Sequence, residues 1–327
     1  MPRCGWVGAS PAKLSSNPRK HYIVDFMNIL VFGTFVGFLS CLYSSTGFAE
    51  SPAELDTAST AQSDVLLVQY PLVEDVYERD FDAYFLEIIE LALKKSGRKY
   101  SFEPVKLPVT VESRSGRMLQ ENKNIVYWLN SSSAREQHLI PIKIPLFKGL
   151  IGWRVLLIRP ELQAEFSKVK TLGDLRRYVA GQGHDWPDTL VLQENNLPVE
   201  SSASWEGLFK MLAAGRIDYF PRSVIEIERE KRIFPSEEIQ VENSLVLHYP
   251  AAYYLFVNKE NTRLANALGT GLQASIESGE MDRVFNNHFA GLLANLSIHK
   301  RRIIELENSQ EFPLDNPRLW YSLDGLN

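Results

Sequence analysis

The residues best suited to bind a ligand follow an apolar strand predicted at 125–129. That strand runs into a hydroxyl-rich turn, Asn130–Ala134, which contains Ser132 and leads to Arg135. The next segment carries two prolines and is too extended for a helix. A second apolar strand follows at 155–158. This order indicates a crossover between two lobes, with a ligand cleft beside Arg135.

Further polar residues follow two other predicted strands. Arg222 and Ser223 follow Pro221, which ends a predicted strand at 217–220, and Gln193 follows a predicted strand at 189–192. Ligands of open α/β sheets bind at the carboxyl ends of strands. The three residues are therefore candidate ligand contacts, and ordinary structural or surface contacts are the alternative for each.

The predicted loop 181–187 holds two glycines together with Gln182 and Trp186. Two interpretations stay open for it: it lines the cleft with backbone donors and a stacking indole, or Trp186 fills the core of its own lobe. Tyr70, near the end of the first predicted strand, is a candidate for stacking on a ligand. Its alternative is an ordinary half-buried aromatic residue.

Composition and motifs argue against several classes of function. The histidines lack metal-ligand spacing, and the sequence contains no H-E-x-x-H, no G-x-S-x-G and no phosphate-binding loop. From Glu50 onward there is no cysteine, and 31 basic residues stand against 39 acidic ones, a net charge of −8. Because nucleic-acid phosphates require clustered Lys and Arg, we expect no nucleic-acid partner. We also expect no metal and no cofactor.

The N-terminal region has the pattern of an export signal. Residues 29–43 are uncharged and apolar, Arg19-Lys20 precede them, and Gly47-Phe48-Ala49 follow. The segment is shorter than the roughly 20 residues of a membrane span. We expect cleavage after Ala49 and a periplasmic protein. An uncleaved membrane anchor and a lipoprotein acylated at Cys41 are the alternatives.

From residue 64 onward, predicted strands and helices alternate, which indicates a parallel sheet with crossover helices. A second α/β unit follows the crossover, and two closing helices are predicted at 264–278 and 281–288. The expected organisation is an N-terminal extension with the signal at 1–49, a linker at 50–63, lobe I at 64–149 and 250–300, lobe II at 150–249, and a tail at 301–327.

Roughly from residue 64 to 290, the chain resembles the type II periplasmic solute-binding proteins, most closely their amino-acid-binding, ABC-transporter-linked branch (extracellular solute-binding protein family 3). In that family a strand ends in a hydroxyl-rich turn and an arginine, and a hinge glycine follows. Here Ser132 precedes Arg135 by three residues and Gly149 follows it by fourteen. The segment Leu212–Phe220 and the stretches at 254–261 and 279–289 are similar to the family's glycine-arginine-aspartate strand, return crossing and final helices.

The resemblance implies an α/β, two-lobed periplasmic-binding-protein-like II fold with a two-strand hinge that closes on a small ligand. Arg135 matches the arginine that binds a ligand carboxylate, and Ser132 matches the adjacent hydroxyl. Where amino-acid receptors carry an acidic residue that binds the amine, this chain has Ser223, with Arg222 beside it. That departure favours a ligand with more than one acidic group, or one without an amine.

We therefore expect a binding protein and not an enzyme: an exported receptor for an amino acid or other carboxylate, with an ABC permease as candidate partner. The first alternative is a sensory or accessory binding protein that acts on a membrane partner. The second is a dehydratase-like enzyme on the same scaffold, for which Glu194 and His184 are the nearby acid–base candidates.

Overall fold

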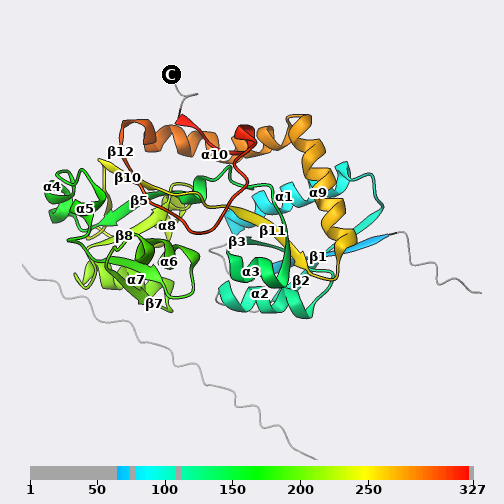
Figure 1. Cartoon of the computed structure of the whole chain (residues 1–327), viewed down its shortest axis with the longest axis horizontal. Coiled ribbons are helices and arrows are strands. Elements are labelled where there is room, and N and C mark those ends of the chain that lie inside the picture. The colour runs from blue at the N-terminus through cyan, green and yellow to red at the C-terminus, as the bar shows by residue number, and fades with distance from the viewer. Residues whose placement is uncertain (1–64, 74–78, 108–111, 324–327) are drawn as a thin grey trace, which may run out of the picture. The chain divides into compact units, whose positions relative to one another are not determined.

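The computed structural model describes residues 65–73, 79–107 and 112–323. Every described residue belongs to one compact unit, residues 59–327. The expected export signal, Cys41 and the linker at 50–63 lie outside the described residues. The strands of the described residues form sheets of two, three and seven members; the two smaller ones, joined by a single bridge, make up the sheet of lobe I, and the largest is the sheet of lobe II (Figure 1).

The sheet of lobe I combines parallel and antiparallel strands. Strands β1 and β2 pair in parallel, whereas β11 pairs antiparallel with both β3 and β4. A parallel bridge between Gln69 and Ile125 joins the two groups. The parallel order expected for the first three strands is therefore confirmed, and the returning strand β11 adds the antiparallel pairs. Its strands are β1 (Leu66–Val73), β2 (Tyr100–Leu107), β3 (Val126–Asn130), β4 (Leu139–Ile142) and β11 (Tyr253–Asn258).

Helices α1 and α9 form the closest helix pair of lobe I. Tyr84, Ile88 and Ala92 of α1 are fully buried at helical spacing. A Cβ atom at Gly271 of α9 would lie 1.7 Å from the carbonyl oxygen of Ala92, so only glycine permits this approach. The helices of lobe I are α1 (Arg79–Lys95), α2 (Glu112–Glu121), α3 (Ser133–His138), α9 (Thr262–Glu277) and α10 (Glu280–Leu296).

The sheet of lobe II has the order β12-β10-β5-β8-β6-β7, and β9 pairs with β5. Strand β6 is parallel to β7 and β8, and β5 is antiparallel to β8 and β10. The strands are β5 (Trp153–Ile158), β6 (Ala180–Gly183), β7 (Val199–Ser202), β8 (Tyr219–Ser223), β9 (Gln240–Val241), β10 (Leu245–His248) and β12 (Arg302–Glu305).

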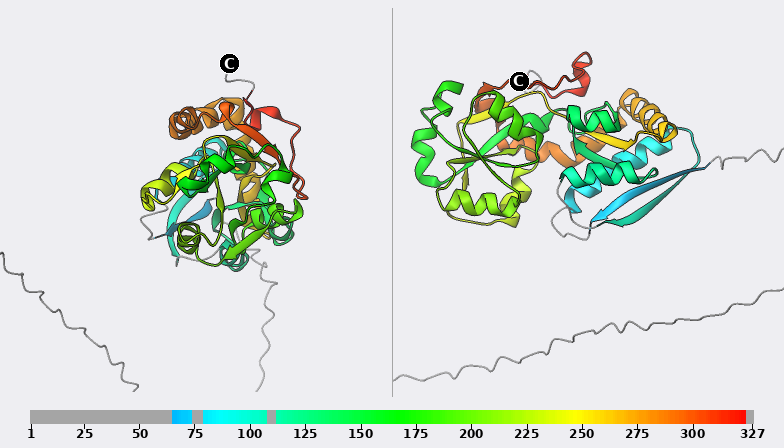
Figure 2. Two further views of the ribbon diagram at one scale, coloured as in Figure 1. Left: turned by 90° about the vertical axis from the view of Figure 1, so that its left-hand side faces the viewer. Right: turned by 60° about the horizontal axis from the view of Figure 1, so that its bottom comes forward.

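Helices pack on both faces of the lobe II sheet (Figure 2). Phe220 of β8 contacts Phe209 of α7, with ring centroids 5.4 Å apart, and the preceding Tyr219 contacts Phe166 of α4 at 5.8 Å. Successive residues of a strand point to opposite faces, so the two helices lie on opposite sides. The helices are α4 (Gln163–Phe166), α5 (Leu172–Leu175), α6 (Pro187–Glu194), α7 (Trp205–Ala213) and α8 (Ile227–Ile233).

Two predictions for lobe II are wrong. The apolar run 189–192, expected to be a strand, lies in α6, and the expected loop at 181–187 begins inside β6. A short apolar run fits either element, and Pro187 at the first helical position together with Asp188 in the first turn favours the helix. Glycine is required at position 183 of this buried strand, because a Cβ atom there would lie 2.4 Å from the indole of Trp186.

Within the described residues the chain passes between the lobes four times (Figure 1). The first two crossings, from β4 to β5 and from β10 to β11, form the expected hinge; Gly149 in the first has φ +72°, a left-handed conformation. The third runs from α10 to β12, and the fourth leaves β12. The segment expected to be a tail thus supplies β12, which pairs in parallel with β10.

Candidate functional site

The end of β3 and the start of α3 form the lobe I side of the site. Ser132 is extended (φ −151°, ψ 151°) and caps α3, and its side chain accepts a hydrogen bond from the backbone N–H of Arg135 at 3.4 Å. Arg135 is half-buried, and its Nη1 donates to the carbonyl oxygen of Asn130. Ser132 and Arg135, predicted from the sequence, therefore lie together at the end of a strand.

One direct contact joins the lobe I side to lobe II. Asn130 Nδ2, at the end of β3, donates to Asp188 Oδ2 in the first turn of α6 at 3.3 Å. Both side chains are buried. Asn130 Oδ1 is also buried and has no hydrogen-bond partner among the described residues. The contact therefore brings a buried acceptor to the boundary between the lobes.

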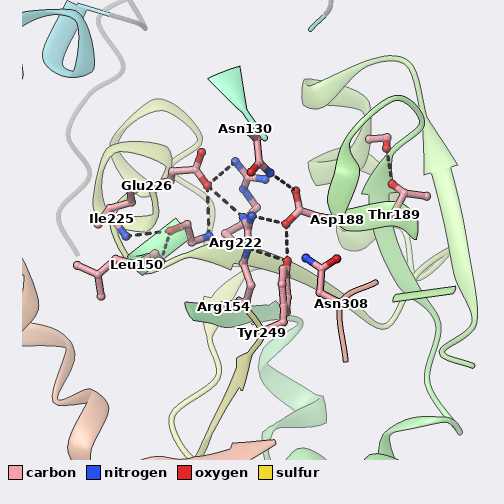
Figure 3. A network of polar contacts seen from close by, with 12 residues as sticks. Asn130, Leu150, Arg154, Asp188, Thr189, Arg222, Ile225, Glu226, Tyr249 and Asn308 are labelled. Carbon is pink, nitrogen blue, oxygen red and sulfur yellow. Dashed lines mark hydrogen bonds and ion pairs between the residues drawn. The ribbon is translucent and has the colours of Figure 1, made fainter. Parts of the chain in front are cut away.

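Arg154 of β5 holds Asp188 in place from within lobe II (Figure 3). Its Nη2 donates to Asp188 Oδ1, its Nε donates to Tyr249 Oη at 3.0 Å, and its Nη1 donates to Glu226 Oε2 at 3.4 Å. The Tyr249 hydroxyl in turn donates to Asp188 Oδ1. Asp188 thus accepts hydrogen bonds from three side chains: Arg154 of lobe II, Tyr249 of the hinge and Asn130 of lobe I.

Burial sets the protonation of this network. Burial alone would lower the pKa of Arg154, but the negative charges of Asp188 and Glu226 and the hydrogen bond with Tyr249 raise it, so the guanidinium stays charged. Burial also raises the pKa of Tyr249 well above its usual value, so its hydroxyl keeps the proton that it donates to Asp188.

Arg222, expected to face a ligand, is 5% exposed and pairs with two carboxylates of α8 and its N-terminus. Its Nε donates to both oxygens of Glu230 at 2.8 and 2.9 Å, and its Nη2 lies 3.1 Å from Glu226 Oε2. Its guanidinium also lies over the ring of Trp186, 4.8 Å from the centroid. Burial raises the pKa of Glu230 more than Arg222 lowers it. This geometry makes Arg222 part of the lobe II interior.

Ser223, at the position of the expected ammonium-binding acid, also contacts its own lobe. Its Oγ donates to the carbonyl oxygen of Leu150 at 3.0 Å, and its backbone N–H donates to Glu226 Oε2 at 3.3 Å. A carboxylate therefore does lie beside Ser223, but it comes from three residues later and already neutralises Arg154 and Arg222.

The remaining sequence-predicted residues are not brought together. Gln182 is fully buried in β6, and neither of its amide atoms has a hydrogen-bond partner among the described residues. Trp186 packs on Gly183 and Arg222 inside lobe II. Gln193 is exposed near the end of α6, and Tyr70 of β1 is half-buried against Phe102, with ring centroids 4.4 Å apart.

The side chains of the interlobe network that were missed from the sequence include Asn130, Arg154, Asp188 and Tyr249. Asn130 stood at the start of the polar turn and could have been included with Ser132. The other three carry no local signal, since Arg154 and Tyr249 lie inside apolar strand and hinge segments and Asp188 follows a proline. Only the tertiary contacts reveal them.

A separate cavity of about 390 Å³ lies in lobe II and does not belong to this site. Its lining is mostly apolar, and Lys231 at its edge lies 3.4 Å from Glu228. Across the described residues no three His, Cys, Asp or Glu side chains gather as metal ligands. None of the described helices is long and apolar enough to cross a membrane.

The comparisons with known proteins agree with this architecture at the level of fold. No protein-family model and no curated protein matches the chain. The periplasmic VFT2 domain of Bordetella pertussis BvgS matches with a TM-score of 0.51 and 16% identity, over 68% of this chain and 92% of that chain. The BvgS periplasmic domain as a whole matches with a TM-score of 0.50 and 16% identity, over 68% of this chain and 42% of that chain.

A third match is a Salmonella typhimurium periplasmic binding protein described as having high arginine specificity, with a TM-score of 0.48 and 16% identity, over 68% of this chain and 98% of that chain. At these identities the likeness shows the fold alone. The chain has the two-lobed, periplasmic-binding-protein-like type II fold, so the predicted fold class is confirmed.

Proposed function

We propose that this protein is an exported solute-binding protein that closes its two lobes on a small, polar, carboxylate-bearing ligand. The observation that carries the proposal is the interlobe contact of Asn130 with Asp188, directly beside Ser132 and Arg135. Convergent polar groups at the boundary of two lobes are typical of a ligand site. In this proposal the apolar segment at 29–43 directs the protein to export. The protein would then deliver its ligand to an ABC permease or signal to a membrane sensor.

Arg135 and Ser132 supply the donors for the ligand carboxylate. A guanidinium presents its N–H donors in a planar fork that matches a carboxylate, and the bond from Arg135 Nη1 to the Asn130 carbonyl places this fork at the end of β3. The Ser132 hydroxyl accepts from a backbone N–H and retains its own proton for donation. A carboxylate placed over the N-terminus of α3 would therefore meet both.

The class of ligand follows from the lobe II side. Arg222 is paired with Glu230 and Glu226, so the idea of two arginines binding a ligand with two acidic groups loses its support. The buried Asn130 Oδ1 would instead accept a hydrogen bond from an N–H or O–H of the ligand. A small carboxylate that also carries an amine, amide or hydroxyl fits these groups, and amino acids are included.

A thermal-shift screen of the chain from Glu50 onward tests the proposal, with amino acids, hydroxy acids, dicarboxylates, short peptides and sugars as ligands. A ligand at a hundred times its dissociation constant stabilises the folded state by about 2.7 kcal/mol. We expect the shift only with carboxylates, and we expect Arg135→Ala to abolish it. Arg177→Ala, an exposed arginine of lobe II, is the matched control. A shift that survives in Arg135→Ala, or one produced only by sugars, would contradict the proposal.

A further inference from the structure

The segment Leu306–Gln310, which we call the strap, leaves β12 along the outside of lobe II (Figure 2). The backbone N–H of Leu306 donates to the carbonyl oxygen of His248 at 2.8 Å. The side chain of Asn195, at the end of α6, then pairs with the backbone of Glu307: its Nδ2 donates to the Glu307 oxygen at 2.8 Å, and its Oδ1 accepts from the Glu307 N–H at 3.0 Å. The strap therefore begins firmly attached to lobe II.

The next residues of the strap carry it across to lobe I. Asn308 Nδ2 donates to the carbonyl oxygen of Pro250 in the hinge at 2.8 Å. Ser309 Oγ donates to Glu194 Oε1 of lobe II at 2.8 Å. Gln310 Nε2 donates to Glu136 Oε1 of α3 at 3.2 Å, and its Oε1 accepts from the hydroxyl of Ser133 in the same helix. Three consecutive residues thus contact the hinge, lobe II and lobe I.

The chain beyond the strap is fixed to the first hinge crossing. The backbone N–H of Tyr321 donates to the carbonyl oxygen of Lys148 at 2.8 Å. A Cβ atom added at Gly149 would lie 2.4 Å from the nearest ring atom of Trp320, so the indole packs directly on this glycine. The segment from Leu306 to Tyr321 is therefore attached at both ends, to the lobe II sheet at its start and to the hinge at its end.

We propose that the strap is a latch that limits how far the two lobes open and holds α3 close to the end of α6. A hinge of two crossings lets lobes rotate freely, since only the hinge backbone must change. The strap is bonded to both lobes within five residues. An opening rotation would therefore break either the hydrogen bonds of Gln310 to α3 or those of Glu307 and Ser309 to the end of α6. Each such hydrogen bond shifts an open–closed equilibrium by about twofold to tenfold.

The latch has a consequence for binding that rests on the proposed function. Gln310 contacts Ser133 and Glu136, which flank Arg135 in α3. The apparent affinity for a ligand falls when only a fraction of the protein is in the closed, binding-competent form. A latch that raises this fraction therefore raises the apparent affinity. The strap would therefore act as a positioning element for the ligand site, and loss of the strap would weaken ligand binding without removing any ligand contact.

Distances between two spin labels on the full chain test the latch without any ligand. The labels are placed at Arg117→Cys in α2 and Lys210→Cys in α7, both exposed, after Cys4 and Cys41 are replaced by serine. We expect one narrow distance distribution for the parent protein and a second, longer population in Gln310→Ala. The matched control is Gln273→Ala, which removes an exposed glutamine amide that donates a hydrogen bond within α9. It should leave the distribution unchanged.

Amide hydrogen exchange gives a second readout on the same variants. In Gln310→Ala we expect exchange at residues 308–310 to rise by about tenfold, while β5 and β11 remain protected. An unchanged distance distribution in both Gln310→Ala and the Ser309→Ala, Gln310→Ala double variant would overturn the latch. Because neither readout uses a ligand, failure of the latch is distinguishable from failure of the proposed function.

Discussion

The two sides of the interlobe site use similar charged residues in opposite ways. Arg135 of lobe I is half-buried on a short helix, and one of its nitrogens bonds a backbone carbonyl. Arg222 of lobe II is buried, bonds both oxygens of Glu230 and lies 3.1 Å from Glu226. The sequence predicts a ligand contact for both arginines. The structure makes one a candidate ligand contact and the other an internal counterion.

The difference shows that a charged side chain at a strand end becomes an internal counterion where its own lobe supplies the carboxylates that pair with it. In lobe II the two guanidiniums of Arg154 and Arg222 share three carboxylates, so the charges are compensated before any ligand arrives. In lobe I the buried Asn130 Oδ1 still lacks a partner among the described residues. Mutations on the two sides should therefore separate stability from binding.

The largest effect is expected for Arg222→Ala. Removing one partner of a buried ion pair leaves the other charge uncompensated, which costs about 3–5 kcal/mol of unfolding free energy. Urea unfolding monitored by circular dichroism measures the loss. The nearby exposed Arg216→Ala is the control and should stay within about 0.5 kcal/mol of the parent. A loss below 1 kcal/mol in Arg222→Ala would show that this arginine is not part of the lobe II interior.

The next effect is expected for Tyr249→Phe, which removes only the hydroxyl. Arg154 Nε and Asp188 Oδ1 would each lose a buried partner, and we expect a loss of about 1–3 kcal/mol. The same unfolding assay applies, and Tyr100→Phe on half-buried β2 is the matched control. If Tyr249→Phe is as stable as Tyr100→Phe, the hydroxyl of Tyr249 does not stabilise Asp188.

A pH effect distinguishes lobe II further. Because the pKa of Glu230 is raised in the folded protein, the folded state binds more protons than the unfolded state above the ordinary value of 4.5. The contribution of Glu230 to stability is therefore fully present below pH 4.5 and falls as the pH rises through the raised pKa. Glu230→Gln should flatten this part of the stability–pH profile. A profile with the same slope in both proteins would assign the titration to another group.

The smallest effect on stability is expected for Arg135→Ala. The side chain is half-buried on a six-residue helix, so we expect the ligand-free protein to change by no more than about 1 kcal/mol. The ligand-induced shift should nevertheless disappear, as described for the screen. A large loss of stability in the ligand-free variant would instead make Arg135 a structural residue like Arg222 and remove the contrast between the lobes.

The sequence by itself determined the fold class and most of the elements. The apolar strand before Ser132, the amphipathic helix α1 and the helix α7 closed by Gly215 were all recognisable, because their periodicity and caps are local properties. It failed at α6, where an apolar run of a few residues suits a strand as well as a helix. It also failed at β12, whose pairing with β10 depends on a partner more than fifty residues away.

The tertiary structure alone decided which polar residues meet. Asp188 contacts Asn130, Arg154 and Tyr249 across separations of 58, 34 and 61 residues, and no spacing rule covers such distances. Arg222 and Arg135 look alike in sequence because each follows an apolar run predicted to be a strand, but the structure places Arg222 inside β8. Their roles diverge because burial forces Arg222 to find carboxylates within its own lobe, whereas Arg135 is half-buried on α3, the helix that the strap contacts through Ser133 and Glu136.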